Sequence, residues 1–201
     1  MITVFTDGSC VYGNPGNAAG AYVAMRDGVL LEALGIPIGQ STNNRGEMAG
    51  AIQGLLAAAR HAQPGEEVLL VSDSTYVVEG MRNARDRVAR LAFNHDLWKE
   101  MADAADALAA SEHALHVKWV RGHKGNPGNT LSDRLARAAA REQRKHTMDM
   151  VFKNECLVSP APLICHDNTV HPTASYPRQN TTGFDHPVRR GEEIAACSNA
   201  C

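Results

Sequence analysis

The sequence predicts an α/β domain with a mixed five-stranded sheet flanked by helices, followed by an irregular C-terminal tail. Short apolar runs suited to strands occur from residue 2 to residue 120, and the later runs alternate with helical stripes of apolar residues. The dipeptide Asp27-Gly28 lies between two of the early runs, and Asp-Gly in that position is typical of a hairpin. Strands that pair first as hairpins and then alternate with helices indicate an antiparallel meander joined to parallel strands.

The first three strands are expected at residues 2–7, 20–25 and 29–34. A glycine-rich turn at 13–16 precedes the second strand, and the Asp-Gly turn joins the second strand to the third. Since each connection is short, we expect neighbouring strands of this group to run antiparallel.

Helices and central strands follow this meander. The side chains at residues 42–44 offer oxygen atoms that can cap a helix, and apolar residues then recur with a 3.6-residue period up to Ala59. Residues 68–71 form a continuous apolar run, which is typical of a central strand covered on both faces. The remaining expected elements are further helix from about 75 to 110, a last strand at 116–120 and a last helix at 131–144.

The pattern ends near residue 146. Residues 150–201 contain five of the nine prolines and four of the five cysteines, without helical or alternating periodicity. We therefore expect a folded domain at 1–146 and a disordered or irregular extension at 147–201. A zinc site in this Cys- and His-containing tail is an alternative, although the tail has no closely spaced Cys-x₂-Cys pair.

Composition limits the classes of function. The formal net charge is −2, while residues 1–147 hold 16 basic and 16 acidic side chains. The N-terminus runs directly into a strand pattern, no apolar run has transmembrane length, and Cys10 is the only cysteine before the tail. We expect a cytoplasmic monomer without membrane contact. The basic stretch 118–145 is either a solvated helix face or the footprint of a polyanionic ligand.

Four carboxylates stand out: Asp7, Glu47, Asp73 and Asp133. Asp7 and Asp73 each close an apolar strand, and open α/β sheets place their sites at the carboxyl ends of strands. Glu47 and Asp133 are expected near the starts of helices, where an acid can also be a simple cap or turn former. Acids gathered in one place repel one another, and a divalent cation relieves that repulsion. The sequence therefore predicts a carboxylate site for Mg²⁺.

An ordered set of motifs resembles the type 1 ribonuclease H family over roughly residues 1–145. The matching segments are TDGS at 6–9, GNPG at 13–16, TNNRGE at 42–47, SDSTYV at 72–77, VRGH at 120–123, GNPGN at 125–129 and DRLA at 133–136. A single TDGS or GNPG string occurs by chance in turns, but the complete order with compact spacing is specific.

The resemblance implies an endonuclease that hydrolyses the RNA strand of RNA–DNA hybrids and leaves 5′-phosphate and 3′-hydroxyl ends. It implies two Mg²⁺ ions, with Mn²⁺ as a substitute. Asp7 would bridge both ions, Glu47 and Asp73 would hold one, and Asp133 would help to hold the other. Two ions about 4 Å apart can activate a water molecule and stabilise the leaving oxygen of an in-line displacement.

The resemblance also implies roles for five polar residues outside the carboxylate set. His123 would assist proton transfer or product departure, although a lone loop histidine is more often a solvated side chain. Asn14, Asn43 and Asn44 match positions that contact the minor groove of the hybrid, and turn or cap formation is a compatible second role. Thr75 stands where the family often has a longer glutamine, which puts the contact there in question.

A second departure concerns residues 81–94. Many bacterial members carry a long protrusion here that is rich in tryptophan and lysine. This chain has a short segment with four arginines, at 82, 85, 87 and 90, and no tryptophan before Trp98. Fewer phosphate contacts predict weaker binding of the substrate with a gentler dependence on salt.

Two other functions remain open at this point. A nuclease of the same fold, such as a transposase, resolvase or exonuclease, also uses clustered acids, but the segments at 13–16 and 42–47 favour hybrid binding. A non-catalytic hybrid-binding module would be expected to lack a carboxylate, and this sequence has all four.

Overall fold

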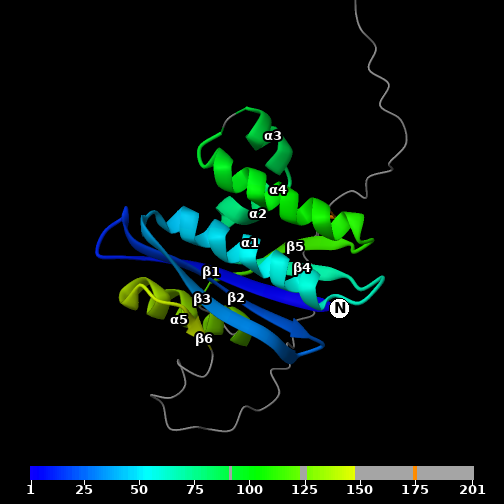
Figure 1. The fold of residues 1–201 in the computed structure, drawn as a ribbon, viewed down its shortest axis with the longest axis horizontal. Coiled ribbons are helices and arrows are strands. Elements are labelled where there is room, and N and C mark those ends of the chain that lie inside the picture. The colour runs from blue at the N-terminus through cyan, green and yellow to red at the C-terminus, as the bar shows by residue number, and fades with distance from the viewer. Residues whose placement is uncertain (91, 123–125, 148–173, 176–201) are drawn as a thin grey trace, which may run out of the picture.

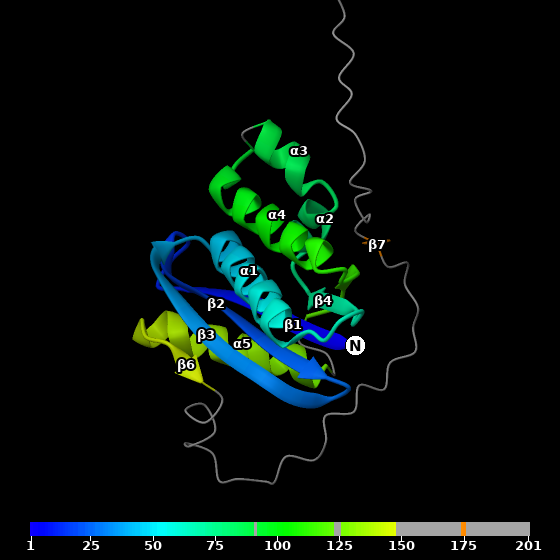
Figure 2. The same ribbon diagram turned by 45° about the vertical axis from the view of Figure 1, so that its right-hand side comes forward.

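The computed structural model describes residues 1–90, 92–122, 126–147 and 174–175. A central sheet has the strand order β6-β3-β2-β1-β4-β5-β7. Helices α1 to α4 lie on one face of the sheet and α5 crosses the other face (Figures 1 and 2). Among the described residues, no helix is long and apolar enough to cross a membrane.

The first three strands form the expected antiparallel meander, but each is longer than the sequence predicted. They are β1 (Ile2–Val11), β2 (Gly16–Arg26) and β3 (Val29–Ser41). Beyond the apolar runs, the strands continue through small and polar residues, because hydrogen bonding between paired neighbours sustains them there. The expectation that Asp7 closes its strand was therefore wrong, because this residue lies within β1 and pairs with Ala21.

Parallel strands complete the mixed sheet. Strand β4 (Val68–Ser72) pairs in parallel with β1, and β5 (Leu115–Trp119) pairs in parallel with β4. The five expected strands are therefore present. Two strands of two residues each extend the sheet at its edges: β6 (His146–Thr147) pairs with β3, and β7 (Ala174–Ser175) pairs with β5.

Helix α1 (Asn43–His61) begins where its cap was predicted. The Oγ1 atom of Thr42 accepts a hydrogen bond from the backbone N–H of Arg45, at 3.4 Å. The expected helical stretch from 75 to 110 is divided into three helices: α2 (Thr75–Met81), α3 (Ala84–Ala89) and α4 (His95–Ala110).

Helix α5 (Pro127–Glu142) begins four residues earlier than predicted. The Oδ1 atom of Asn126 caps it by accepting from the backbone N–H groups of Gly128 and Asn129, and Pro127 occupies the first turn. Asp133 therefore lies in the second turn of α5 rather than in its first, and the cap of this helix is Asn126. A cap role for Asp133 is excluded.

The hydrophobic core has a layer on each face of the sheet. The larger layer packs α1 and α4 against β1, β2 and β4, and its largest buried side chain is Trp98. The smaller layer packs α5 against the other face, around Phe5 and Leu135. The sheet is thus packed on both sides, which holds the paired strands β1 and β4 in place.

Strand β6 attaches the C-terminal end of the domain to the sheet by pairing with β3. His146 is 3% exposed and pairs with Gly35, and Thr147 pairs with Leu34. This strand runs one residue past the expected boundary at 146. Apart from β7, the expected irregular tail and its possible zinc ligands lie outside the described residues.

Two truncations should separate the domain from the tail. Removal of 148–201 is expected to change the melting temperature little, because β6 is kept and β7 contributes only two residues to a sheet edge. Removal of 146–201 also deletes the buried His146 and is expected to lower the melting temperature by about 5 °C or more.

Both proteins would be unfolded by heat under reducing conditions, with and without added zinc, beside the full-length chain. A drop of several degrees for the longer truncated protein would mean that part of the tail belongs to the folded unit.

Candidate active site

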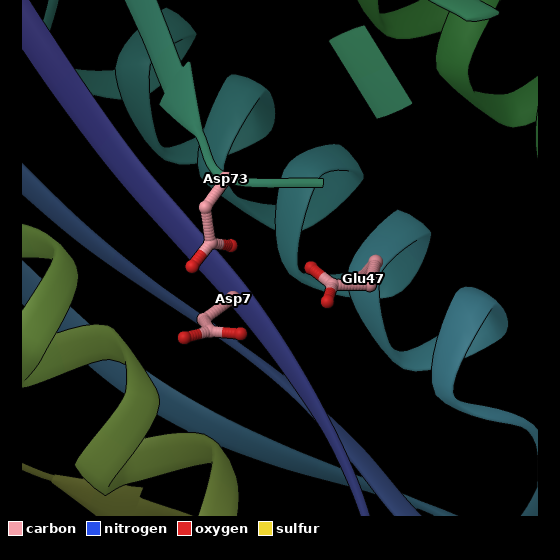
Figure 3. Close-up of side chains that lie close together, drawn as sticks. All are labelled: Asp7, Glu47 and Asp73. Atoms are coloured by element: carbon pink, nitrogen blue, oxygen red, sulfur yellow. The ribbon is translucent and has the colours of Figure 1, made fainter. Parts of the chain in front are cut away.

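Three carboxylates converge from three elements of the fold. Asp7 lies on β1, Asp73 follows the last residue of β4, and Glu47 lies on α1 (Figure 3). Strands β1 and β4 are parallel neighbours in which Thr6 pairs with Ser72, so Asp7 and Asp73 are the next residues along adjacent chain segments. One ligand atom from each of the three acids lies within 4.8 Å of the others.

Glycines allow Glu47 to come this close. A Cβ atom built on Gly8 would lie 2.3 Å from the backbone nitrogen of Glu47, and one on Gly20 would lie 2.4 Å from the backbone oxygen of Gly46. Any side chain at these positions would push α1 away from the sheet. The TDGS and TNNRGE segments therefore meet backbone to backbone, which places the two acids together.

Asp133 joins the same pocket from α5. The cavity of about 390 Å³ is lined by all four acids, by Asn43, by β1 residues 8–11 and by two arginines, Arg137 and Arg141. Asp133 is 18% exposed, and its Oδ1 atom accepts a hydrogen bond from Nε of Arg137 at 2.7 Å. The structure thus gathers all four sequence-predicted carboxylates at one pocket, three of them in tight contact.

Burial and mutual repulsion make the ionised state of this cluster costly. Burial, followed by the charges of Asp73 and Asp133, raises the pKa of Asp7 to about 8. Burial, followed by the charges of Asp7 and Asp73, raises the pKa of Glu47 well above its ordinary value. The Oε2 atom of Glu47 is buried and has no hydrogen-bond partner. Buried carboxylate oxygens without partners suit a hard divalent cation such as Mg²⁺.

Hydrogen bonds orient the individual carboxylates. The backbone N–H of Gly8 donates to Oδ1 of Asp7 at 2.7 Å. The side-chain amide of Asn43 donates to Oε1 of Glu47 at 3.3 Å, and that of Asn129 donates to Oδ2 of Asp73 at 3.2 Å.

Of the residues expected to contact substrate, Asn43 lines the pocket. Asn14, Asn44 and Thr75 are exposed. Asn14 also accepts a hydrogen bond through Oδ1 from the backbone N–H of Asn43, at 3.1 Å, so the 13–16 turn is tied to the start of α1. His123 lies outside the described residues, and its role stays a prediction.

Sequence reasoning missed three residues at this site. Arg137 and Arg141 follow Asp133 at intervals of four residues, so the helical period could have placed them beside it. Asn129 lies in a segment that was quoted for its resemblance, but only the fold brings its amide to Asp73.

The comparisons with known proteins agree with this geometry. The RNase H family model matches residues 1–141. The chain is 37% identical to a ribonuclease H of Pseudomonas putida and 39% identical to one of Pseudomonas fluorescens. Each alignment covers 71% of this chain. It covers 95% of the Pseudomonas putida protein and 92% of the Pseudomonas fluorescens protein. The chain belongs to the RNase H family.

A solved structure supports the same assignment. The crystal structure of RNase H1 from Halobacterium salinarum is similar, with a TM-score of 0.55 and 27% identity over 71% of this chain and 98% of that one. The mixed sheet flanked by helices is thus the RNase H fold, and membership of the family supports a nuclease that acts by hydrolysis.

The raised pKa values predict how stability depends on pH. An acid whose folded-state pKa is raised binds protons more tightly when folded, so stability falls as pH rises from about 4 towards about 8. Asp7→Asn removes this cost and is expected to stabilise the metal-free protein at pH 8.5 by a few kcal/mol, since one pKa unit is about 1.4 kcal/mol. At pH 4.5 the gain should be much smaller.

Mg²⁺ should also raise the melting temperature of the wild-type protein more at pH 8.5 than at pH 5.5, because protons compete with the ion. Thermal unfolding followed by circular dichroism measures both effects, with the exposed Asp103→Asn as control. An equal gain for Asp7→Asn at both pH values would contradict the electrostatic account.

Proposed function

We propose that this protein is an Mg²⁺-dependent endonuclease that hydrolyses the RNA strand of RNA–DNA hybrids and leaves 5′-phosphate and 3′-hydroxyl ends. The observation that carries the proposal is the convergence of Asp7, Glu47 and Asp73 beside Asp133 in a chain of the RNase H family. We further propose that it acts as a cytoplasmic monomer through a domain spanning residues 1–146.

The four acids would hold two ions. Asp7, central in the cluster, would contact both, with Glu47 and Asp73 on one ion and Asp133 on the other. Bound in this way, Mg²⁺ would supply a nucleophilic water and charge stabilisation for the leaving 3′-oxygen. Mn²⁺, which also accepts oxygen ligands, would substitute.

The protein's own groups prepare this site for the ions. The buried position of Glu47 excludes water from one side of the cluster, and the Gly8 N–H fixes one oxygen of Asp7. Because the acids are held in place before an ion binds, little rearrangement is needed when charge develops at the phosphate. Arg137 and Arg141 at the pocket wall would offset the negative charge of the substrate backbone.

Hybrid recognition would come from the amides around the pocket. Asn14 and Asn44 are exposed, whereas Asn43 combines a contact to Glu47 with its position in the first turn of α1. We propose that these residues, with Thr75, contact the minor groove, where 2′-hydroxyls and base edges are displayed. A non-catalytic binding module is disfavoured because no carboxylate of the cluster is missing.

A comparison of duplexes tests the proposed function. Purified protein is expected to cleave an RNA–DNA hybrid in the presence of Mg²⁺, and to leave RNA–RNA and DNA–DNA duplexes intact. Asp7→Asn should abolish cleavage while leaving hybrid binding largely unchanged, because the amide keeps the shape of the side chain but cannot hold an ion. Cleavage products resolved on a gel, with binding measured by fluorescence anisotropy, provide the readout.

Cleavage by Asp7→Asn within tenfold of wild type would sink the metal-site interpretation. Cleavage of DNA duplexes at a similar rate would instead favour another nuclease of the same fold.

His123→Ala should slow turnover without abolishing it. The carboxylates would still hold the ions that generate the nucleophile, while an imidazole with a reference pKa near 6.5 would assist only the proton steps. Single-turnover and steady-state rates at pH 7 would separate the chemical step from product departure. Complete loss of activity with unchanged Mg²⁺ binding would give this histidine a larger part than proposed here.

A further inference from the structure

Asn129 on α5 places a buried side-chain amide against the carboxylate of Asp73. It is 3% exposed, and its Nδ2 atom donates to Oδ2 of Asp73 at 3.2 Å. A buried amide is costly unless it is hydrogen-bonded, so this position is maintained by its contact. No role follows for Asn129 from the resemblance or from helix formation.

The chemistry of the pair fixes its direction. An ionised carboxylate only accepts hydrogen bonds, so the amide must present its NH₂ group to Asp73. The Oδ1 atom of Asn129 is then left buried without a partner. The side chain therefore satisfies Asp73 at the expense of its own oxygen, which is the arrangement expected when the carboxylate is the group being oriented.

Two further residues lie close to Asp73. A Cβ atom built on Gly122 would lie 2.5 Å from Oδ2 of Asp73, so a glycine is needed where the chain passes this oxygen. The indole N–H of Trp119 donates to the backbone oxygen of Asp73 at 2.9 Å. Asn129 and Gly122 therefore both lie beside the Oδ2 atom of Asp73.

Helix geometry connects this contact with the fourth acid. Asn129 and Asp133 are four residues apart on α5, and residues with that spacing lie one turn apart on the same helix face. One face of α5 therefore supplies an amide to Asp73 and a carboxylate to the pocket. The position of α5 sets the distance between the acid from β4 and its own acid.

We propose that Asn129 is a positioning residue for the metal site: it holds Asp73 with one oxygen facing the ion and keeps α5 in register with β4. This inference rests on the proposed function, since it concerns the same carboxylates. Partners of metal-binding carboxylates typically contribute about 10- to 100-fold in metal affinity or activity.

Two substitutions test the role. Asn129→Ala removes the donor, and Asn129→Leu removes it while filling a similar volume, so that packing is better preserved. Thr130→Ala is the matched control, because this neighbouring exposed side chain donates only to the backbone oxygen of Asn126. Mg²⁺ affinity would be measured by calorimetry on the full-length chain, together with hybrid cleavage over a range of Mg²⁺ concentrations and the melting temperature.

Both Asn129 variants are expected to bind Mg²⁺ about tenfold or more weakly and to recover part of their cleavage rate at high Mg²⁺, while Thr130→Ala matches wild type. The proposal would be overturned if both variants bound Mg²⁺ within twofold of wild type and lost cleavage activity only in proportion to their drop in melting temperature. Asn129 would then be a structural residue. If wild type neither binds Mg²⁺ nor cleaves hybrid, the proposed function itself fails, which is a different result.

Discussion

The repulsion among Asp7, Glu47 and Asp73 is the constraint on which the rest of this structure depends. Three carboxylates with ligand atoms within 4.8 Å of one another, two of them buried, cannot all be charged without a large electrostatic cost. Burial together with that repulsion raises the pKa of Asp7 to about 8. The fold must therefore hold the acids together by interactions stronger than their repulsion, and it does so through the backbone.

Two backbone arrangements hold the three acids together against their repulsion. The parallel pairing of β1 with β4 brings Asp7 and Asp73 side by side, and core layers on both faces hold the sheet. The glycine contacts between α1 and the sheet then bring in Glu47. A cluster held in this way is ready for an ion before the ion binds, so that binding relieves strain that folding has already introduced.

The start of α1 is fixed from its other side by α4. Arg45 forms a bidentate ion pair with Asp96, and it also donates to the side chain of Asn94. Asn94 in turn donates to the hydroxyl of Tyr76 on α2. The turn of α1 that carries Asn43 and Glu47 is thus connected to the helices that follow β4. Movement of those helices would be transmitted to the acid cluster.

Sequence reasoning reached the fold and the four acids because both depend on local patterns. Aspartates that follow apolar runs, a capped helix and an ordered motif set are visible without coordinates. The length of the meander strands was not, because pairing extends β1 to β3 through residues with little strand preference. The start of α5 was predicted four residues late, because its cap at Asn126 precedes the apolar stripe from which the helix was inferred. The Asn129 contact joins residues 56 positions apart, and no local pattern encodes it.

In the short segment 81–94, packing decides whether an arginine is available to contact a phosphate. Its arginines were counted together as phosphate contacts, yet the Arg87 guanidinium lies over the ring of Trp98 at 4.8 Å and over that of Tyr76 at 5.7 Å. A cation stacked on two rings is stabilised in place, and its Nε atom is buried. Arg87 therefore serves to attach α3 to the core, while Arg82 and Arg90 stay exposed. Since each phosphate contact adds to the salt dependence of binding, this use of Arg87 lowers the expected salt slope further than the count of arginines suggests.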